Sequence, residues 1–201
     1  MRHFHDLMFP DQYYHVFNRA VGDEKFFRYQ GNYLFFIHRF EKYILPIADV
    51  YSYCLLPNHF HFLIRIKCIN ELTALPGFAK LSADRIAYKL SKQFSNMFNS
   101  YSKSYNLMFG RKGTLFMRPF NRLIVKNDHY LTKLVHYIHA NPVQHGYCKS
   151  ISEWYFSFYK KILYEIPGSL QREKVLSWFG GVMPYRIFHG QTVMIKSKVG
   201  G

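Results

Sequence analysis

The sequence predicts an α+β domain with the ferredoxin-like order β-α-β-β-α-β, an antiparallel sheet with helices packed on one face, and one added helix. Two strand-like runs joined by a Pro-Asn turn, and an amphipathic stretch on either side of that pair, favour this class. An aromatic content of 19% in 201 residues suits one well-buried core. We therefore expect one domain over residues 1–150, and a C-terminal extension over 151–201 that is partly docked and frayed at its end.

The first half of the chain supplies the first strand, a helix and a hairpin. Residues 13–21 are rich in aromatic and β-branched side chains, which is typical of a strand. Residues 32–45 alternate apolar and charged groups as an amphipathic helix does, and a proline follows them. Residues 50–56 and 60–67 are strand-like and are separated by Pro57-Asn58, so they predict a hairpin.

The second half supplies a long helix, a last strand and the added helix. Apolar residues at steps of three and four predict a helix over 83–105. Residues 114–126 are strand-like, although Pro119 implies an edge position or a bulge. Asp128 is a suitable N-cap for a further helix, which should end at Asn141 because a proline follows.

The charge of the chain narrows the classes of partner. Lys and Arg number 27 against 12 Asp and Glu, which gives a formal charge of +15 and favours a polyanion. The most apolar stretch, residues 33–50, is interrupted by five charged or histidine side chains, so we expect no membrane span. Three scattered cysteines predict no disulfide framework and indicate a reducing, cytoplasmic compartment. Nucleic acid is therefore the expected partner.

A His-x-His pair lies at the start of the second hairpin strand. His59 and His61 are two residues apart, so both imidazoles should project from the same face of the sheet. Two nitrogen ligands would leave positions open for oxygen donors, as a catalytic metal site requires. Packing of two half-buried histidines on the sheet is the competing interpretation. A zinc site that uses Cys54 or Cys68 would have no common spacing.

The added helix carries a tyrosine and an asparagine on one face. Tyr137 and Asn141 are four residues apart, which is about one helical turn. Because the chain has 17 tyrosines, composition alone does not favour Tyr137 over Tyr130 or Tyr147 as a reactive group.

A basic segment lies between the histidine pair and this helix. Residues 85–127 contain nine Lys and Arg and no acidic residue, with aromatic residues interleaved among them. Cations for phosphates and rings for unstacked bases are the components of a surface that binds single strands. Six basic residues are the expected DNA contacts, the first at the end of the first strand: Arg19, Arg111, Lys112, Arg118, Arg122 and Lys126.

Four segments in this order resemble the REP-associated tyrosine transposases, a branch of the HUH single-tyrosine transposase and nuclease superfamily. They are residues 13–19, residues 56–63, residues 111–126 and residues 136–143. Together they span roughly residues 10–150, so the resemblance covers the expected domain and leaves the extension unmatched.

The resemblance implies an activity and assigns the site residues. It makes Tyr137 the nucleophile and makes His59 and His61 the paired metal ligands, with Asn141 as the third ligand where related transposases often have Gln. The implied cofactor is Mg²⁺ or Mn²⁺. The implied reaction cleaves and rejoins single-stranded or hairpin DNA through a covalent 5′-phosphotyrosine. Because that link conserves the phosphodiester energy, we expect no requirement for ATP.

Two alternatives stay open at this stage. One is a non-catalytic DNA-binding relative of the same fold, and the other is a metal nuclease in which water replaces Tyr137 as the nucleophile. The resemblance is compatible with a monomer and with a homodimer.

Overall fold

The computed structural model has an antiparallel sheet, and its main strands and helices follow one another along the chain in the order that the sequence predicts. The structure describes residues 5–127, 130–166 and 170–190. Within these residues the order of the strands across the sheet is β2-β3-β1-β4, and every neighbouring pair is antiparallel. The strands are β1 Tyr13–Arg19, β2 Ala48–Leu56, β3 His59–Ile66 and β4 Asn121–Ile124. The ferredoxin-like order is confirmed, with β1 and β3 at the centre.

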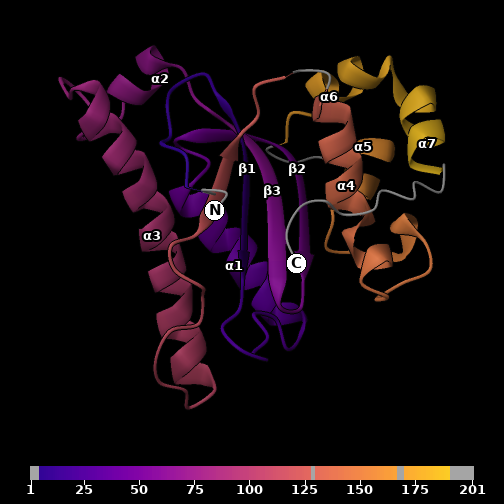
Figure 1. Cartoon of the computed structure of the whole chain (residues 1–201), viewed down its shortest axis with the longest axis horizontal. Helices are drawn as coiled ribbons and strands as arrows, with labels where there is room; N and C mark the ends of the chain where they lie inside the picture. Colours follow the sequence, from indigo (N-terminus) through magenta and orange to yellow (C-terminus); the bar gives the residue numbers. More distant parts are fainter. Residues whose placement is uncertain (1–4, 128–129, 167–169, 191–201) are drawn as a thin grey trace.

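Helices cover both faces of the sheet: the two helices of the ferredoxin-like order share one face, as the sequence predicts, and the added helix covers the other face. The first four are α1 Gln30–Tyr43, α2 Ile69–Thr73, α3 Ala83–Met108 and α4 Leu131–Gln144. Figure 1 shows α3 and α4 on opposite sides of the strands, and α1 packs beside α3. None of the helices in the described ranges combines the length and hydropathy that a bilayer crossing requires.

The side chains of β3 explain why the two faces differ. Phe60 and Phe62 point toward α1, where the Phe62 ring stacks on Phe40 at 4.2 Å between centroids and Phe60 lies 5.3 Å from Phe36. Successive residues of a strand face opposite sides, so His61 must point toward α4. One strand therefore supplies an aromatic core on one face and a polar site on the other.

The last strand is shorter than the predicted range of 114–126. β4 begins at Asn121, just after Pro119, which lacks the N–H that a ladder needs. The residues before the proline still bond to the end of β1, because the Met117 N–H donates to the Arg19 carbonyl at 3.0 Å. The prediction of an edge strand is confirmed, but its pairing with β1 is divided into one part before Pro119 and one part after it.

Helix α4 differs from its prediction at its C-terminal end. The helix was expected to end at Asn141, yet it continues to Gln144 with Pro142 inside its last turn. The His145 N–H donates to the Asn141 carbonyl at 3.0 Å, which closes that turn. Asn141 is consequently a fully buried residue within a helix. The expected cap Asp128 lies outside the described residues.

The C-terminal extension packs along the outer edge of β2. It contains the 3₁₀ turn η2 Ile151–Glu153 and the helices α5 Tyr159–Leu163, α6 Arg172–Phe179 and α7 Val182–Gly190. The Leu55 N–H donates to the Phe156 carbonyl and the Phe158 N–H donates to the Tyr53 carbonyl, both at 2.9 Å. These bonds pair backbone groups that a strand edge would otherwise leave open to association. The expected frayed end falls in residues 191–201, outside the described residues.

We expect Phe36→Ala to lower the free energy of unfolding by about 3–5 kcal/mol, because it empties the centre of the aromatic core. The Phe36 side chain is fully buried and lies 5.1 Å from Tyr101, measured between ring centroids. Leu34→Ala on the same helix is the matched control, since Leu34 is 52% exposed. Urea unfolding measures both, and equal losses in the two variants would contradict this account of the core.

Candidate active site

The site begins where β1 and β3 run side by side beneath α4. In the antiparallel register Arg19 is opposite His59, and Phe17 is opposite His61. The short Pro57-Asn58 turn fixes where β3 starts, so His59 is the first residue of the strand. Both histidines face α4, whose residue Tyr137 lies 5.6 Å from His61 between ring centroids.

Two buried polar atoms at this point have no hydrogen-bond partner among the described residues: Nε2 of His59 and Oδ1 of Asn141. The other polar atoms of these side chains are engaged, because His59 Nδ1 lies 2.8 Å from Asn58 Oδ1, and Asn141 Nδ2 donates to the Tyr137 carbonyl at 2.8 Å. A buried polar atom without a partner costs free energy, so each one calls for a specific explanation.

A third histidine orients His61. Nε2 of His15 lies 2.9 Å from Nδ1 of His61, and the two rings are stacked. This bond occupies Nδ1 of His61 and leaves Nε2 as its second nitrogen. Metal-bound histidines usually make such a hydrogen bond with one ring nitrogen, which orients the other nitrogen toward the metal.

The histidines of the site are held neutral. Burial lowers the pKa of His15 to about 3 and that of His59 to about 4. Burial, with His15 and His59 close by, lowers the pKa of His61 well below its usual value. A neutral imidazole offers a lone pair, which is the form that coordinates a metal.

The structure distinguishes Tyr137 from the two other tyrosines that composition left open. Tyr130 and Tyr147 are exposed, whereas Tyr137 is half-buried with its ring 6.1 Å from that of His15. Burial raises the pKa of the Tyr137 phenol above its usual value of 10.0, and the neighbouring amide of Asn141 opposes that rise. Asn141 therefore lies beside both Tyr137 and His59.

The donors fit a divalent cation with mixed nitrogen and oxygen ligation. His59 Nε2, His61 Nε2 and Asn141 Oδ1 are two neutral imidazole nitrogens and one amide oxygen, a set that suits Mn²⁺ and admits Mg²⁺. Within the described ranges no group of three or more His, Cys, Asp or Glu side chains is arranged to hold a metal. A metal site here would therefore need a third ligand of another type, and the amide oxygen of Asn141 is a candidate.

Two residues near the site were not singled out from the sequence. His15 supports His61, and the ring of His145 lies 4.6 Å from that of His59. His15 could have been found from the predicted fold, because β1 and β3 are neighbours in a ferredoxin-like sheet and His15 alternates with Phe17. His145 follows the helix that the sequence ended too early, so no local signal pointed to it.

The six basic residues expected to contact DNA fall into two groups. Four are exposed at the protein surface: Arg19, Lys112, Arg118 and Lys126. Arg19 lies near the histidines, since its charge contributes to the lowered pKa of both His59 and His145. Arg118 is held toward α3 by a 3.2 Å bond from its guanidinium to Asn99 Oδ1.

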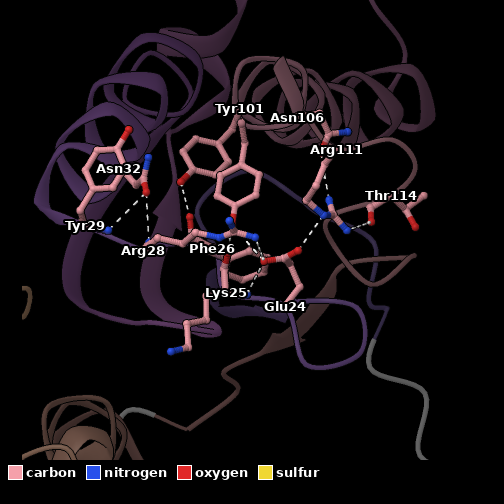
Figure 2. A network of polar contacts seen from close by, with 11 residues as sticks. Glu24, Lys25, Phe26, Arg28, Tyr29, Asn32, Tyr101, Asn106, Arg111 and Thr114 are labelled. Carbon is pink, nitrogen blue, oxygen red and sulfur yellow. Dashed lines mark hydrogen bonds and ion pairs between the residues drawn. The ribbon is translucent and has the colours of Figure 1, made fainter. Parts of the chain in front are cut away.

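The other two, Arg111 and Arg122, already have partners within the protein. Figure 2 shows Arg111 in a network centred on Glu24, to which its Nε donates at 2.6 Å. Arg122 is half-buried, donates from Nε to the Asp6 carbonyl at 2.6 Å, and lies over the Phe120 ring. These contacts connect segments that are distant in the chain. Each guanidinium is therefore less available for phosphate than the count of basic residues suggests.

A second cluster of histidines joins α4 to α7. Ser52 Oγ lies 2.9 Å from Nε2 of His139, whose Nδ1 is 3.0 Å from Nε2 of His189. Both rings are buried, and burial lowers the pKa of His139 well below its usual value and that of His189 to about 3. This cluster fixes the helix that carries Tyr137 against β2 and the extension.

The four-stranded antiparallel sheet with helices on both faces defines the class of fold, which is that of a solved REP-associated tyrosine transposase. A solved structure described as that transposase bound to a REP hairpin has this fold, with a TM-score of 0.59 over 83% of this chain and 89% of its own, at 18% identity.

A relative with a similar sequence is a protein of Haemophilus influenzae named "Putative REP-associated tyrosine transposase". It is 30% identical over 121 residues, which are 59% of this chain and 63% of that protein. The match therefore spans less than two thirds of the relative. No family model matches the chain. The sequence relative agrees with the resemblance that the motifs indicated, and the solved structure confirms the fold.

We expect the free energy of unfolding to fall as the pH is lowered below about 6.5, the usual histidine value. In that range an unfolded histidine binds a proton, whereas folded His189 does so only at about 3. The unfolded state then binds more protons, so stability is lost toward acid, by up to about 1.4 kcal/mol per pH unit for each such group.

Urea unfolding at several pH values between 7 and 4 measures this slope. His189→Gln, which keeps a polar side chain that does not titrate, should give a shallower slope than the unaltered chain. His38→Gln is the control because His38 is exposed on α1. Stability that does not change over this range would contradict the expectation.

Proposed function

We propose that the chain is a DNA transposase that cleaves and rejoins single-stranded or hairpin DNA through a covalent 5′-phosphotyrosine at Tyr137. The observation that carries the proposal is the pair of buried, unpartnered acceptors, His59 Nε2 and Asn141 Oδ1, beside that tyrosine. The name of the Haemophilus influenzae relative and the hairpin-bound structural neighbour support the same class.

The ligand set supports a requirement for a divalent metal. His59, His61 and Asn141 would hold Mg²⁺ or Mn²⁺, which when bound supplies Lewis-acid polarisation of the scissile phosphate. The protein orients two of these donors itself, because Asn58 fixes the ring of His59 and His15 fixes the ring of His61. Preorganised ligands need little rearrangement when substrate arrives.

Tyr137 would act as the nucleophile. Its phenolic oxygen attacks the phosphorus and forms the phosphotyrosine bond, while the bond from phosphorus to the leaving 3′ oxygen breaks. The phenolic proton is lost in this step, and the leaving oxygen gains a proton to become a free 3′-hydroxyl. Burial raises the pKa of Tyr137, and the neighbouring amide of Asn141 opposes this rise and so favours the phenolate.

The reverse step would join strands. A 3′-hydroxyl attacks the phosphorus of the phosphotyrosine, and the phenolate leaves and takes up a proton. Bond energy is kept in the tyrosine link, so neither direction consumes ATP.

A hairpin or single-stranded substrate fits the distribution of charge. The formal charge of +15 attracts phosphates, and Arg19 is exposed at the end of β1, next to the histidines. The REP hairpin belongs to the structural neighbour, and we extend the hairpin class, without its sequence, to this chain.

Tyr137→Phe should abolish a covalent protein–DNA adduct, because the variant lacks the attacking oxygen. The assay incubates protein, Mn²⁺ and a library of single-stranded and hairpin oligonucleotides and separates the adducts on a denaturing gel. Tyr130→Phe is the matched control, since Tyr130 is exposed on the segment that leads into α4. An undiminished adduct in Tyr137→Phe would reject the assignment.

The same gel separates the alternative functions. Cleavage that persists without any adduct would indicate a nuclease that uses water. Strong binding without cleavage of any oligonucleotide would indicate a non-catalytic relative.

Asn141→Ala and His59→Ala should each weaken Mn²⁺ binding by at least about 10-fold, because each removes one of three protein ligands. Isothermal titration calorimetry of the DNA-free protein measures this directly. His38→Ala, on the exposed face of α1, should bind Mn²⁺ as the unaltered chain does. Unchanged affinity in both site variants would contradict the proposed ligand set.

A further inference from the structure

A shallow pocket of about 500 Å³ opens beside the hairpin turn that precedes His59. Its volume is within the range of sites for small ligands, about 300–1,000 Å³. One side comes from residues 25–30, before and at the start of α1, and the other side comes from residues 155–156 of the C-terminal extension. Two distant parts of the chain therefore meet to form it.

Aromatic rings line the pocket in two layers. The inner layer is the parallel stack of Tyr33 on Phe156, with 3.8 Å between centroids and an interplanar angle of 6°. The outer layer is Tyr29 and Tyr155, which are 48% and 70% exposed. Exposed rings at the mouth of a pocket with an apolar back wall offer flat surfaces on which another ring can stack.

The charge at the pocket is positive. Lys25 and Arg28 line it, and the part of the lining that the structure describes contains no carboxylate. Arg28 is held in place by Glu24 at 2.9 Å and lies over the Phe109 ring. Figure 2 shows the amine of Lys25 directed away from this network, so Lys25 supplies a cation that can meet a ligand.

The position of the pocket connects it to the candidate active site. Pro57 belongs to the lining, and its carbonyl accepts a bond from the Phe27 N–H at 3.1 Å. His59 follows Pro57 by two residues, which span at most about 7 Å. The turn that leads into the candidate active site therefore forms part of the pocket lining.

We propose that this pocket holds one unstacked DNA base next to the cleavage site, with the base stacked on Tyr155 and the adjoining phosphate near Lys25. The proposal rests on the proposed function for the identity of the strand. Stacking on an aromatic ring accepts every base, because each has a π face, so the pocket contributes affinity for single strands and little sequence preference.

The test compares two fluorescent strands of about 20 residues, a length chosen to exceed a typical single-strand site. One is oligothymidylate and the other is an abasic strand that keeps every phosphate and lacks the bases. Binding is followed by fluorescence anisotropy in a Tyr137→Phe background, where no adduct forms. We expect oligothymidylate to bind about 5-fold or more tightly than the abasic strand.

Tyr155→Ala should reduce this preference to less than about 2-fold, whereas Tyr155→Phe should keep it, because the ring and not the hydroxyl makes the stack. Lys25→Gln should weaken both strands equally, since it removes a phosphate contact. Tyr88→Ala is the matched control: Tyr88 is also 70% exposed but lies on α3, outside the pocket.

Equal affinity of the starting protein for the two strands, or binding of neither, would overturn the proposal. So would a preference that survives Tyr155→Ala, or one that Tyr88→Ala removes to the same extent. The adduct gel is a separate measurement. A Tyr155-dependent preference together with no adduct would reject strand transfer while supporting the pocket, and an adduct without that preference would do the reverse.

Discussion

The alternation of side chains along β3 is the constraint on which the rest of the molecule depends. Phe60 and Phe62 must lie on one face and His59 and His61 on the other, because a strand repeats every two residues. A shift of the β3 register by one residue would bury the imidazoles in the aromatic core and expose the phenylalanines. The Phe62 stack on Phe40 therefore fixes the direction of the histidines as well as the core.

Local signals in the sequence were sufficient for the parts of the fold that depend on neighbours in the chain. The Pro57-Asn58 turn located the hairpin, and the three- and four-residue steps located α3. The length of β4 and the end of α4 could not be predicted, because each depends on pairing with a distant segment. Pro142 shows this best, since a proline inside the last turn is tolerated where the rest of the helix is packed.

The residues of the candidate site also divide into those that the sequence indicates and those that only the folded chain brings together. His59 and His61 are recognisable from spacing and position, and Tyr137 and Asn141 from the resemblance. His15 acts through its contact with His61, which exists only once β1 and β3 are paired. The segment around Arg111 contains no acidic residue, so the sequence indicated no ion-pair partner for it. Its partner Glu24 comes from a loop that follows β1. Charge counting along the chain does not detect partners that the fold brings together.

Tyr137 and Asn141 occupy the same face of one helix. The position of the Asn141 amide and the direction of the Tyr137 phenol are therefore coupled. Any contact that fixes the Asn141 amide also fixes the rotation of α4 about its axis, and with it the direction of the phenol. The buried bonds of His139 to Ser52 and His189 hold that rotation from the opposite side of the helix. A displacement of α4 would withdraw the tyrosine and the amide together, so the site would be either assembled or dismantled as a unit.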